Sequence, residues 1–260
     1  MAWDPAQYLR FADERLRPGF DLLSRIGDLP PGPIIELGCG TGVHTRAIAE
    51  RWPDRAVSGV DASPEMLARA AGSGGSRIGW VEADIATWQS AAPAALIFSN
   101  ATLHWLDTHD SLLPRLMRQL GPAGVLAVQM PRNFDAPSHI LMRETAGEEP
   151  WAGRLAPLLR ADPVARPDFY YGLLAPLAPG GLDLWETEYL HVLAGADNAE
   201  SPVLTWVRGT AVRPLLAPLA AAEQADFAAR YDAKLKRAYP RRADGKTLFP
   251  FRRLFLVARA

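Results

Sequence analysis

The stretch from residue 33 to residue 51 constrains the fold of this chain more than any other segment. A short apolar run ends in Glu36, and glycine then occupies every second position, at Gly38, Gly40 and Gly42. The nine residues that follow place apolar side chains at helical spacing. A strand, a glycine loop and a helix in this order are typical of an open α/β sheet that binds a nucleotide-type ligand. Glycine is needed there because the backbone turns sharply and approaches the ligand closely.

Acidic residues also follow the next two predicted strands. Residues 56–60 form a strand-like run that ends at Asp61, and residues 78–82 form another that is followed by Asp84. A carboxylate at the tip of the second strand can accept hydrogen bonds from both hydroxyls of a ribose. Together with Glu36, three carboxylates in register after three strands would repel a phosphate group and suit a cationic ligand.

The next part of the chain continues the alternation of strands and helices. Residues 94–100 predict a fourth buried strand, residues 111–120 a helix, residues 121–124 a turn and residues 125–130 a fifth strand. Strands that alternate with helices predict a parallel, doubly wound α/β sheet. In such sheets, ligands bind beyond the carboxyl ends of the strands.

The pattern changes after residue 130. Residues 131–181 are rich in proline, arginine and aromatic side chains and contain no clear strand, so they predict an inserted helical cap. Residues 184–190 alternate like a partly exposed strand, residues 219–239 predict a further helix, and residues 253–258 predict a final strand. Because neither a repeat nor a linker interrupts the chain, we expect a single catalytic domain over residues 1–260.

Composition excludes several classes of protein. The chain has 260 residues, of which 48% are hydrophobic, and no apolar run approaches the roughly 20 residues of a membrane helix. A formal net charge of −1 gives no general attraction to nucleic acid. Cys39 is the only cysteine, which excludes internal disulfides and multi-cysteine metal sites. We expect a cytoplasmic protein, a monomer or weak dimer, without a metal, membrane or nucleic-acid partner.

The glycine loop resembles that of a known enzyme class. Glu36 two residues before a G-x-G-x-G loop resembles motif I of the class I S-adenosylmethionine (SAM) methyltransferases. Over nearly its whole length the chain is similar to the trans-aconitate 2-methyltransferase family. The similarity is carried by Trp3-Asp4-Pro5, by the run from Ser99 to Leu106, by the run from Gly124 to Pro131, by Tyr170-Tyr171, by Arg213-Pro214 and by the run from Arg253 to Arg259.

The resemblance implies both a fold and a cofactor. It implies a mostly parallel, seven-stranded, Rossmann-like sheet, an N-terminal helical segment over the cofactor in residues 1–30, and a helical cap inserted at residues 131–181. It implies SAM as the cofactor and S-adenosylhomocysteine as the product. The residues expected to contact the cofactor are Tyr8, Arg15, Glu36, Gly38, Gly40, Thr41, Asp61, Ala62, Met66, Asp84, Ile85, Asn100, Ala101 and Trp105.

The implied reaction transfers the methyl group of SAM to a carboxylate of trans-aconitate or of a related small tricarboxylic acid. A carboxylate, with a reference pKa near ~4, is ionised at neutral pH, so we expect no general base and catalysis by positioning. Arginine binds carboxylates bidentately and suits such a trianion. The residues expected to contact the acceptor are Arg17, His104, Met130, Tyr170, Tyr171, Arg213 and Arg253, with Arg213 first among the arginines.

Departures from the family pattern and alternative functions remain open. The family has glutamine where this chain has His104, which leaves the preference for the acceptor open, and often has proline at the position of Thr41. The acceptor could instead be another small acid, a phenol or an amine. A SAM-binding protein without turnover is a further alternative, although intact Glu36 and Asp61 argue against it.

Overall fold

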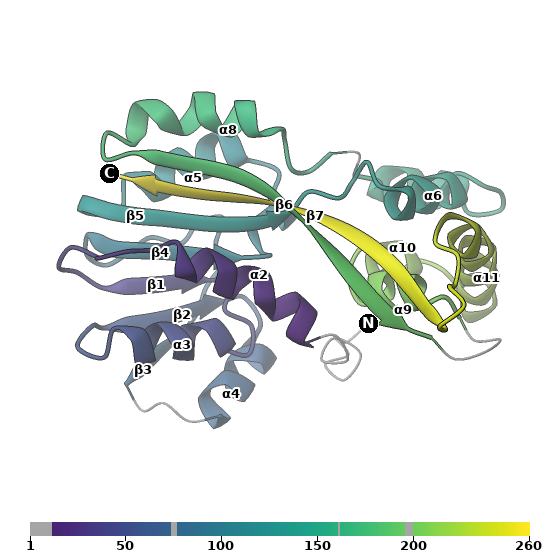
Figure 1. Cartoon of the computed structure of the whole chain (residues 1–260), viewed down its shortest axis with the longest axis horizontal. Coiled ribbons are helices and arrows are strands. Elements are labelled where there is room, and N and C mark those ends of the chain that lie inside the picture. Colours follow the sequence, from purple (N-terminus) through teal and green to yellow (C-terminus); the bar gives the residue numbers. More distant parts are fainter. Residues whose placement is uncertain (1–11, 74–76, 161, 196–199) are drawn as a thin grey trace. The chain divides into compact units, whose positions relative to one another are not determined.

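A single sheet of seven strands forms the frame of the molecule (Figure 1). The computed structural model describes residues 12–73, 77–160, 162–195 and 200–260. The strand order is β3-β2-β1-β4-β5-β7-β6. The strands are β1 (Ile34–Leu37), β2 (Val57–Asp61), β3 (Ile78–Glu82), β4 (Ala94–Asn100), β5 (Leu120–Pro131), β6 (Leu182–Ala194) and β7 (Lys246–Arg259).

The direction of the strands confirms the predicted fold class. The pairs from β3 through β2, β1 and β4 to β5 are all parallel, whereas β7 pairs with β5 in the antiparallel direction. The chain leaves β1 toward β2 on one side and later returns to place β4 on the other side. This reversal beside β1 is the topological switch point at which doubly wound sheets bind their ligands.

The described helices fill the connections between the strands. They are α2 (Ala12–Ser24), α3 (Val43–Arg51), α4 (Pro64–Gly72), α5 (His109–Met117), α6 (Pro137–Ala146), α7 (Ala152–Leu155), α8 (Pro167–Leu174), α9 (Pro202–Arg208), α10 (Arg213–Leu216) and α11 (Ala221–Ala238), with short 3₁₀ turns η1 (Leu103–Trp105), η2 (Ala156–Leu158) and η3 (Ala175–Leu177). Within the described ranges, no helix has the length and apolar character that a membrane crossing needs.

The chain divides into two compact units. The sheet unit comprises Arg15–Pro131, Pro163–Thr187 and Arg253–Ala260, and the helical unit comprises Arg132–Asp162 and Glu188–Arg252 together with residues 12–14. The expected cap at residues 131–181 is thus divided between the two units. Its role as a cap stays a prediction.

The core of the sheet unit follows from strands that are buried on both faces. All four residues of β1 and the first six of β4 are buried, as in strands that helices cover on both sides. Glu36 pairs in register with Phe98, so the two side chains share one face of the sheet. The ring of His44 on α3 lies 4.9 Å from Phe20 on α2 and 6.0 Å from Phe98, so α2 and α3 cover this face.

The helical unit has an aromatic core of its own. Trp151, Phe227, Tyr231 and Phe249 are each fully buried. The Trp151 ring nitrogen donates to the Thr145 carbonyl at 2.7 Å, and the Tyr231 hydroxyl donates to the Ser138 carbonyl at 2.6 Å. Because these buried polar groups are hydrogen-bonded, the aromatic side chains can be buried without an unsatisfied donor.

Some boundaries differ from those that the periodicity predicts. The predicted turn at residues 121–124 lies inside β5, whose pairing with β4 shifts between Ala94↔Leu120 and Leu96↔Val125. Strand β7 begins at Lys246, seven residues before the predicted start at residue 253, because Pro250 and two arginines interrupt its apolar pattern. Helices α9 and α10 were not predicted, since each is too short to show a helical period.

Candidate functional site

The glycine loop is shaped by two glycines that packing requires and one that faces open space. A side-chain carbon at Gly38 would lie 2.1 Å from the Thr102 hydroxyl oxygen, and one at Gly42 would lie 2.3 Å from the Trp80 ring. At Gly40, whose φ is +53°, nothing lies within 4 Å of the added carbon. The loop therefore presents an open backbone surface at its centre, as close approach of a ligand requires.

Asp61, at the end of β2, forms hydrogen bonds with this loop. One carboxylate oxygen accepts a hydrogen bond from the Gly40 N–H at 2.8 Å, and the other accepts from the Ser63 N–H at 2.9 Å. The N–H groups of Gly38 and Cys39 both donate to the Val60 carbonyl, at 2.8 and 3.0 Å. Each carboxylate oxygen has a second lone pair, so Asp61 can still accept the hydroxyls of a ribose.

Glu36 lies buried behind the loop, with 1% of its surface exposed. Its carboxylate accepts a hydrogen bond from the Thr45 hydroxyl, and His44 Nδ1 lies 3.7 Å from its other oxygen. Burial, with a smaller contribution from the nearby Asp61, raises the pKa of Glu36 to about 8. Burial also lowers the pKa of His44, so the imidazole does not neutralise the carboxylate. A bound cation would stabilise the ionised form of Glu36.

The loop after β3 is held in a defined conformation. The exposed Asp84 accepts a hydrogen bond from the Ala86 N–H at 2.9 Å, whereas the neighbouring Ile85 is buried. The Arg115 guanidinium on α5 donates to the carbonyls of Ile85 at 2.8 Å and Ala86 at 2.9 Å. The position of this loop relative to α5 is therefore fixed by a side chain that the sequence did not single out.

The turn that follows β4 is strained and is hydrogen-bonded to the end of β5. Ala101 has a φ of +51°, and its N–H donates to the Gln129 carbonyl at 2.9 Å. The Thr102 hydroxyl lies 3.3 Å from the Gly38 carbonyl and 3.1 Å from the Asn100 carbonyl. These bonds connect the end of β4 with the glycine loop. Positive φ at a residue other than glycine is uncommon and is found often at ligand sites.

Asn100 and Gln129 contribute amide side chains at the ends of β4 and β5. The two residues pair in register, so their side chains lie on the same face of the sheet as Glu36 and Phe98. Gln129 is completely buried, and neither atom of its amide has a hydrogen-bond partner among the described residues. The side-chain oxygen of Asn100 is also buried without a hydrogen-bond partner among the described residues.

Comparison with known proteins then identifies the chain. Residues 34–124 match a family described as "Methyltransferase domain". A trans-aconitate 2-methyltransferase from Azoarcus sp. is 50% identical over 98% of both chains, and one from Streptomyces avermitilis is 50% identical over 99% of this chain and 96% of its own length. The chain belongs to the trans-aconitate 2-methyltransferase family.

Solved structures with low sequence identity share the fold alone. A putative methyltransferase from Bacillus halodurans matches over 94% of this chain and 98% of its own with a TM-score of 0.58 at 10% identity. The phosphoethanolamine N-methyltransferase 2 of Haemonchus contortus matches over 93% of this chain and 52% of its own, with a TM-score of 0.53 at 15% identity. The sheet seen here is thus the sheet of class I methyltransferases.

In this member of the trans-aconitate 2-methyltransferase family, the expected cofactor residues gather at the strand ends. All of those after Arg15 belong to the sheet unit. Met66 lies in the first turn of α4, and the others lie at the ends of β1, β2, β3 and β4 or in the turns that follow these strands: Glu36, Gly38, Gly40, Thr41, Asp61, Ala62, Asp84, Ile85, Asn100, Ala101 and Trp105. Arg15, on α2, is buried. Tyr8 lies outside the described residues. Their contacts with SAM stay predictions.

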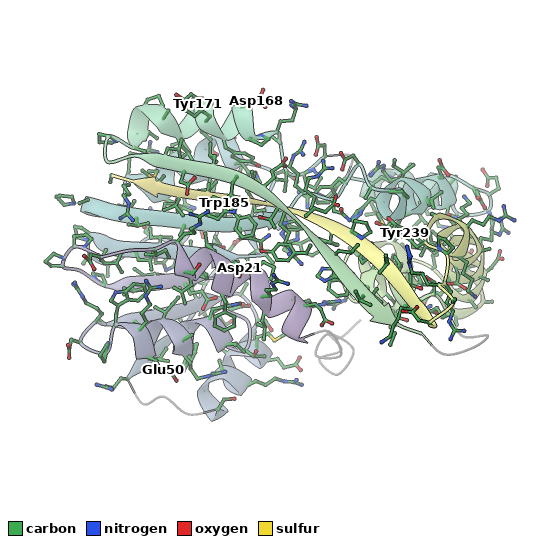
Figure 2. The ribbon with its side chains drawn as sticks, in the orientation of Figure 1. Asp21, Glu50, Asp168, Tyr171, Trp185 and Tyr239 are labelled. Carbon is green, nitrogen blue, oxygen red and sulfur yellow. The ribbon has the colours of Figure 1, made fainter. Side chains whose placement is uncertain are left out.

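The expected acceptor residues of this family member are more dispersed. Arg17 is exposed and lies 3.6 Å from Asp21, and Tyr171 is 61% exposed on α8 (Figure 2). His104 lies in η1, with its ring 4.8 Å from that of Trp105. Arg213 opens α10 in the helical unit. Their contacts with an acceptor stay predictions.

Tyr170 and Met130 are buried in surroundings that occupy their side chains. The Tyr170 oxygen accepts from the Ala165 N–H at 3.2 Å and lies 2.8 Å from His109 Nδ1. A carbonyl can only accept, so His109 Nε2 donates to the Leu103 carbonyl at 2.9 Å. In a neutral imidazole the other nitrogen is an acceptor, so Nδ1 accepts a hydrogen bond from the Tyr170 hydroxyl. Met130 follows Gln129 directly, so its side chain lies on the opposite face of β5.

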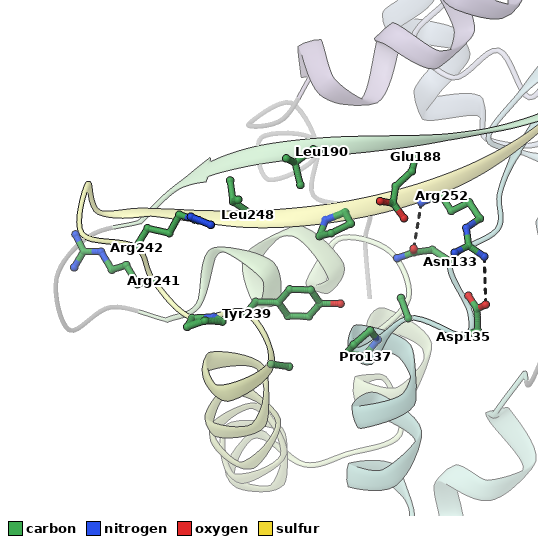
Figure 3. Close-up of a pocket in the computed structure, with 14 residues that line it drawn as sticks. Asn133, Asp135, Pro137, Glu188, Leu190, Tyr239, Arg241, Arg242, Leu248 and Arg252 are labelled. Atoms are coloured by element: carbon green, nitrogen blue, oxygen red, sulfur yellow. Dashed lines mark hydrogen bonds and ion pairs between the residues drawn. The ribbon is translucent and has the colours of Figure 1, made fainter.

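A separate hollow lies within the helical unit (Figure 3). It measures about 640 Å³ and is lined in part by Tyr239, Leu248 and Arg252. The Asn133 side-chain oxygen accepts from the Arg252 N–H at 3.2 Å, and the Arg252 guanidinium lies 3.5 Å from Asp135. None of the residues predicted for the cofactor or the acceptor lines this hollow.

Proposed function

We infer that this protein transfers the methyl group of SAM to a carboxylate of trans-aconitate or of a closely related small tricarboxylic acid. The products are the monomethyl ester and S-adenosylhomocysteine. The observation that carries this inference is the 50% identity to curated trans-aconitate 2-methyltransferases over nearly the whole of both chains. The open centre of the glycine loop and the position of Asp61 beside it agree with a cofactor that carries a ribose.

The cation of SAM fits the charges of the site. Glu36 and Asp61 place carboxylates behind and beside the glycine loop, and Glu36 is buried without a neutralising imidazole. When bound, SAM supplies an electrophilic methyl group on a positive sulfur. The protein then has to orient a carboxylate oxygen in line with that methyl, and good orientation contributes on the order of 7–11 kcal/mol.

The reaction needs no general base from the protein. The acceptor carboxylate is already ionised at neutral pH, because the reference pKa of such a group is near ~4. Positive and negative charge disappear together as the methyl moves, so a site that excludes water favours the transfer. We propose that the helical cap supplies this exclusion and that Arg213, Arg253 and Arg17 bind the acceptor. We also propose that the protein acts in the cytoplasm as a monomer or weak dimer, without nucleic acid.

The proposal can be tested by comparing acceptors. We expect purified protein with SAM to produce S-adenosylhomocysteine rapidly with trans-aconitate and far more slowly with citrate, a phenol or a primary amine. If calorimetry showed that SAM binds and no acceptor gave a product, the protein would instead be a SAM-binding protein without turnover. Faster turnover of the phenol or the amine would retain the methyltransferase and change its acceptor class.

A further inference from the structure

Gln129 combines complete burial with an unsatisfied amide at the end of the proposed reaction site. Its side chain has no exposed surface, and both its nitrogen and its oxygen lack hydrogen-bond partners in the part of the chain that the structure describes. Buried polar groups in native proteins are nearly always paired. An orphaned amide at the carboxyl end of a parallel strand therefore points to a partner that arrives with a ligand.

The position of Gln129 is fixed by its backbone and its neighbours. Its carbonyl accepts the Ala101 N–H, and its register partners are Asn100 on β4 and Phe255 on β7. The Phe255 ring is stacked on Trp185, with centroids 4.8 Å apart and planes 8° apart. A side chain that projects from such a well-packed strand end can hold a ligand group in one orientation.

The register also places Gln129 at a suitable distance from the glycine loop. Strand β4 lies between β1 and β5, and neighbouring strands are about 4.8 Å apart. Gln129 is therefore about 10 Å across the sheet from β1, on the face that carries Glu36. Because two strand spacings separate them, an acceptor bound at Gln129 need not overlap a cofactor seated over the end of β1.

Arg253 lies on the same face as Gln129 but carries a charge. It pairs with Pro131, two residues beyond Gln129 along β5, and only 4% of its surface is exposed. In the proposed reaction, charge disappears from the reacting carboxylate in the transition state. A cation on that carboxylate would bind the ground state more strongly than the transition state, whereas a neutral amide donor loses less as the charge disappears.

We propose that the amide N–H group of Gln129 donates a hydrogen bond to the reacting carboxylate of the acceptor and orients it toward the methyl group, while Arg253 binds a carboxylate that does not react. This assignment rests on the proposed function and adds to it the residue that contacts the reacting group. The oxygen of the same amide can accept a hydrogen bond from ordered water in the closed site.

The first test replaces the amide and keeps its volume. Gln129→Met should lower kcat with trans-aconitate about ten- to one-hundredfold, because the donor and its alignment are lost. The affinity for SAM and the melting temperature should stay within error. Gln119→Met is the matched control: Gln119 precedes β5 at its other end, and its side-chain oxygen accepts from the Ser90 N–H. We expect this control to keep the wild-type kcat.

The second test uses the pH profile, which a purely structural role would not change. In Gln129→Glu, a protonated carboxyl can donate as the amide does, whereas the ionised form repels the acceptor. The activity of this variant should rise as the pH falls from about 8 to about 6, since burial raises the pKa of a carboxyl. With both proteins assayed at saturating SAM, the wild-type activity should stay level over the same range.

The outcomes separate the inference from the function on which it rests. Wild-type kcat in Gln129→Met, or a parallel loss of SAM affinity and stability, would overturn the role of Gln129 and leave the methyltransferase intact. A pH profile of Gln129→Glu that follows the wild type would do the same. If the wild-type protein produced no ester of trans-aconitate at all, the proposed function itself would fail, and this assignment with it.

Discussion

At the scale of single residues, Asp61 joins three parts of the site. Its two oxygens hold the Gly40 and Ser63 N–H groups, and so the end of β2, the glycine loop and the start of α4 have one common acceptor. The sequence predicted Asp61 from its place at the end of a strand. It did not predict these two backbone bonds, because they depend on the fold of the loop.

Replacement of Asp61 tests its role in binding SAM. Asp61→Ala removes a charged acceptor, which is worth roughly 1.5–3 kcal/mol, so we expect SAM to bind about ten- to one-hundredfold more weakly. The control is Asp54→Ala, which removes an exposed carboxylate before β2 and should bind SAM as the wild type does. Titration calorimetry measures both affinities. Unchanged affinity in Asp61→Ala would remove this residue from the cofactor site.

Glu36 should give the ligand-free protein a distinctive pH dependence. Its pKa in the folded state is raised to about 8 from an ordinary value of 4.5. The unfolded chain therefore loses this proton first, and the free energy of unfolding falls as the pH rises between these values, by at most about 1.4 kcal/mol per pH unit. Glu36→Gln should lack this decline. Denaturant titrations from pH 5 to pH 8 measure it, and identical slopes in the two proteins would contradict a raised pKa for the buried Glu36.

At the scale of elements, the sequence predicted those parts whose pattern is local. Strands β1 to β4 and helix α3 lie within a residue of the predicted ranges, because each combines a local apolar pattern with a glycine or polar boundary. The partnership of Asn100 with Gln129 could not be predicted, since it depends on the register between two strands. For the same reason, the sequence favoured Met130 as a residue that contacts the acceptor, whereas the register favours its neighbour Gln129.

The glycine loop should respond differently at two of its glycines. Gly38→Ala creates a clash with Thr102 in addition to an unfavourable φ, so we expect it to lower the free energy of unfolding by about 2–4 kcal/mol. Gly40→Ala meets open space and should cost about 1–2 kcal/mol for its φ alone, yet weaken SAM binding. Urea unfolding and calorimetry on both variants test this. Equal stability of the two variants would contradict the packing of Thr102 against the loop.

At the scale of the whole molecule, the division into two units has no signal in the composition. The boundaries at residues 187/188 and 252/253 fall inside the long strands β6 and β7, so no proline-rich or glycine-rich linker marks them. A search for linkers therefore predicts one domain. Each unit is instead assembled from segments that lie far apart in the sequence.

Arg213 is the arginine that the sequence favours most for binding the acceptor, and its replacement tests this prediction. Arg213→Met keeps the volume and removes the charge, so we expect the KM for trans-aconitate to rise about tenfold or more, with SAM affinity unchanged. Arg208→Met is the control, because Arg208 forms an ion pair with Glu200 in the same unit. Steady-state kinetics distinguish the two. If both variants behaved alike, Arg213 would have no special role in binding the acceptor.

The central claim is that this protein esterifies a small tricarboxylate with the methyl group of SAM, and one measurement tests it directly. The protein is incubated with trans-aconitate and SAM that carries a deuterated methyl group, and the products are analysed by mass spectrometry before and after mild alkali. We predict one labelled methyl group on trans-aconitate, in an ester that alkali removes, together with an equal amount of S-adenosylhomocysteine. Unlabelled trans-aconitate after complete incubation with protein shown to bind SAM would contradict the claim.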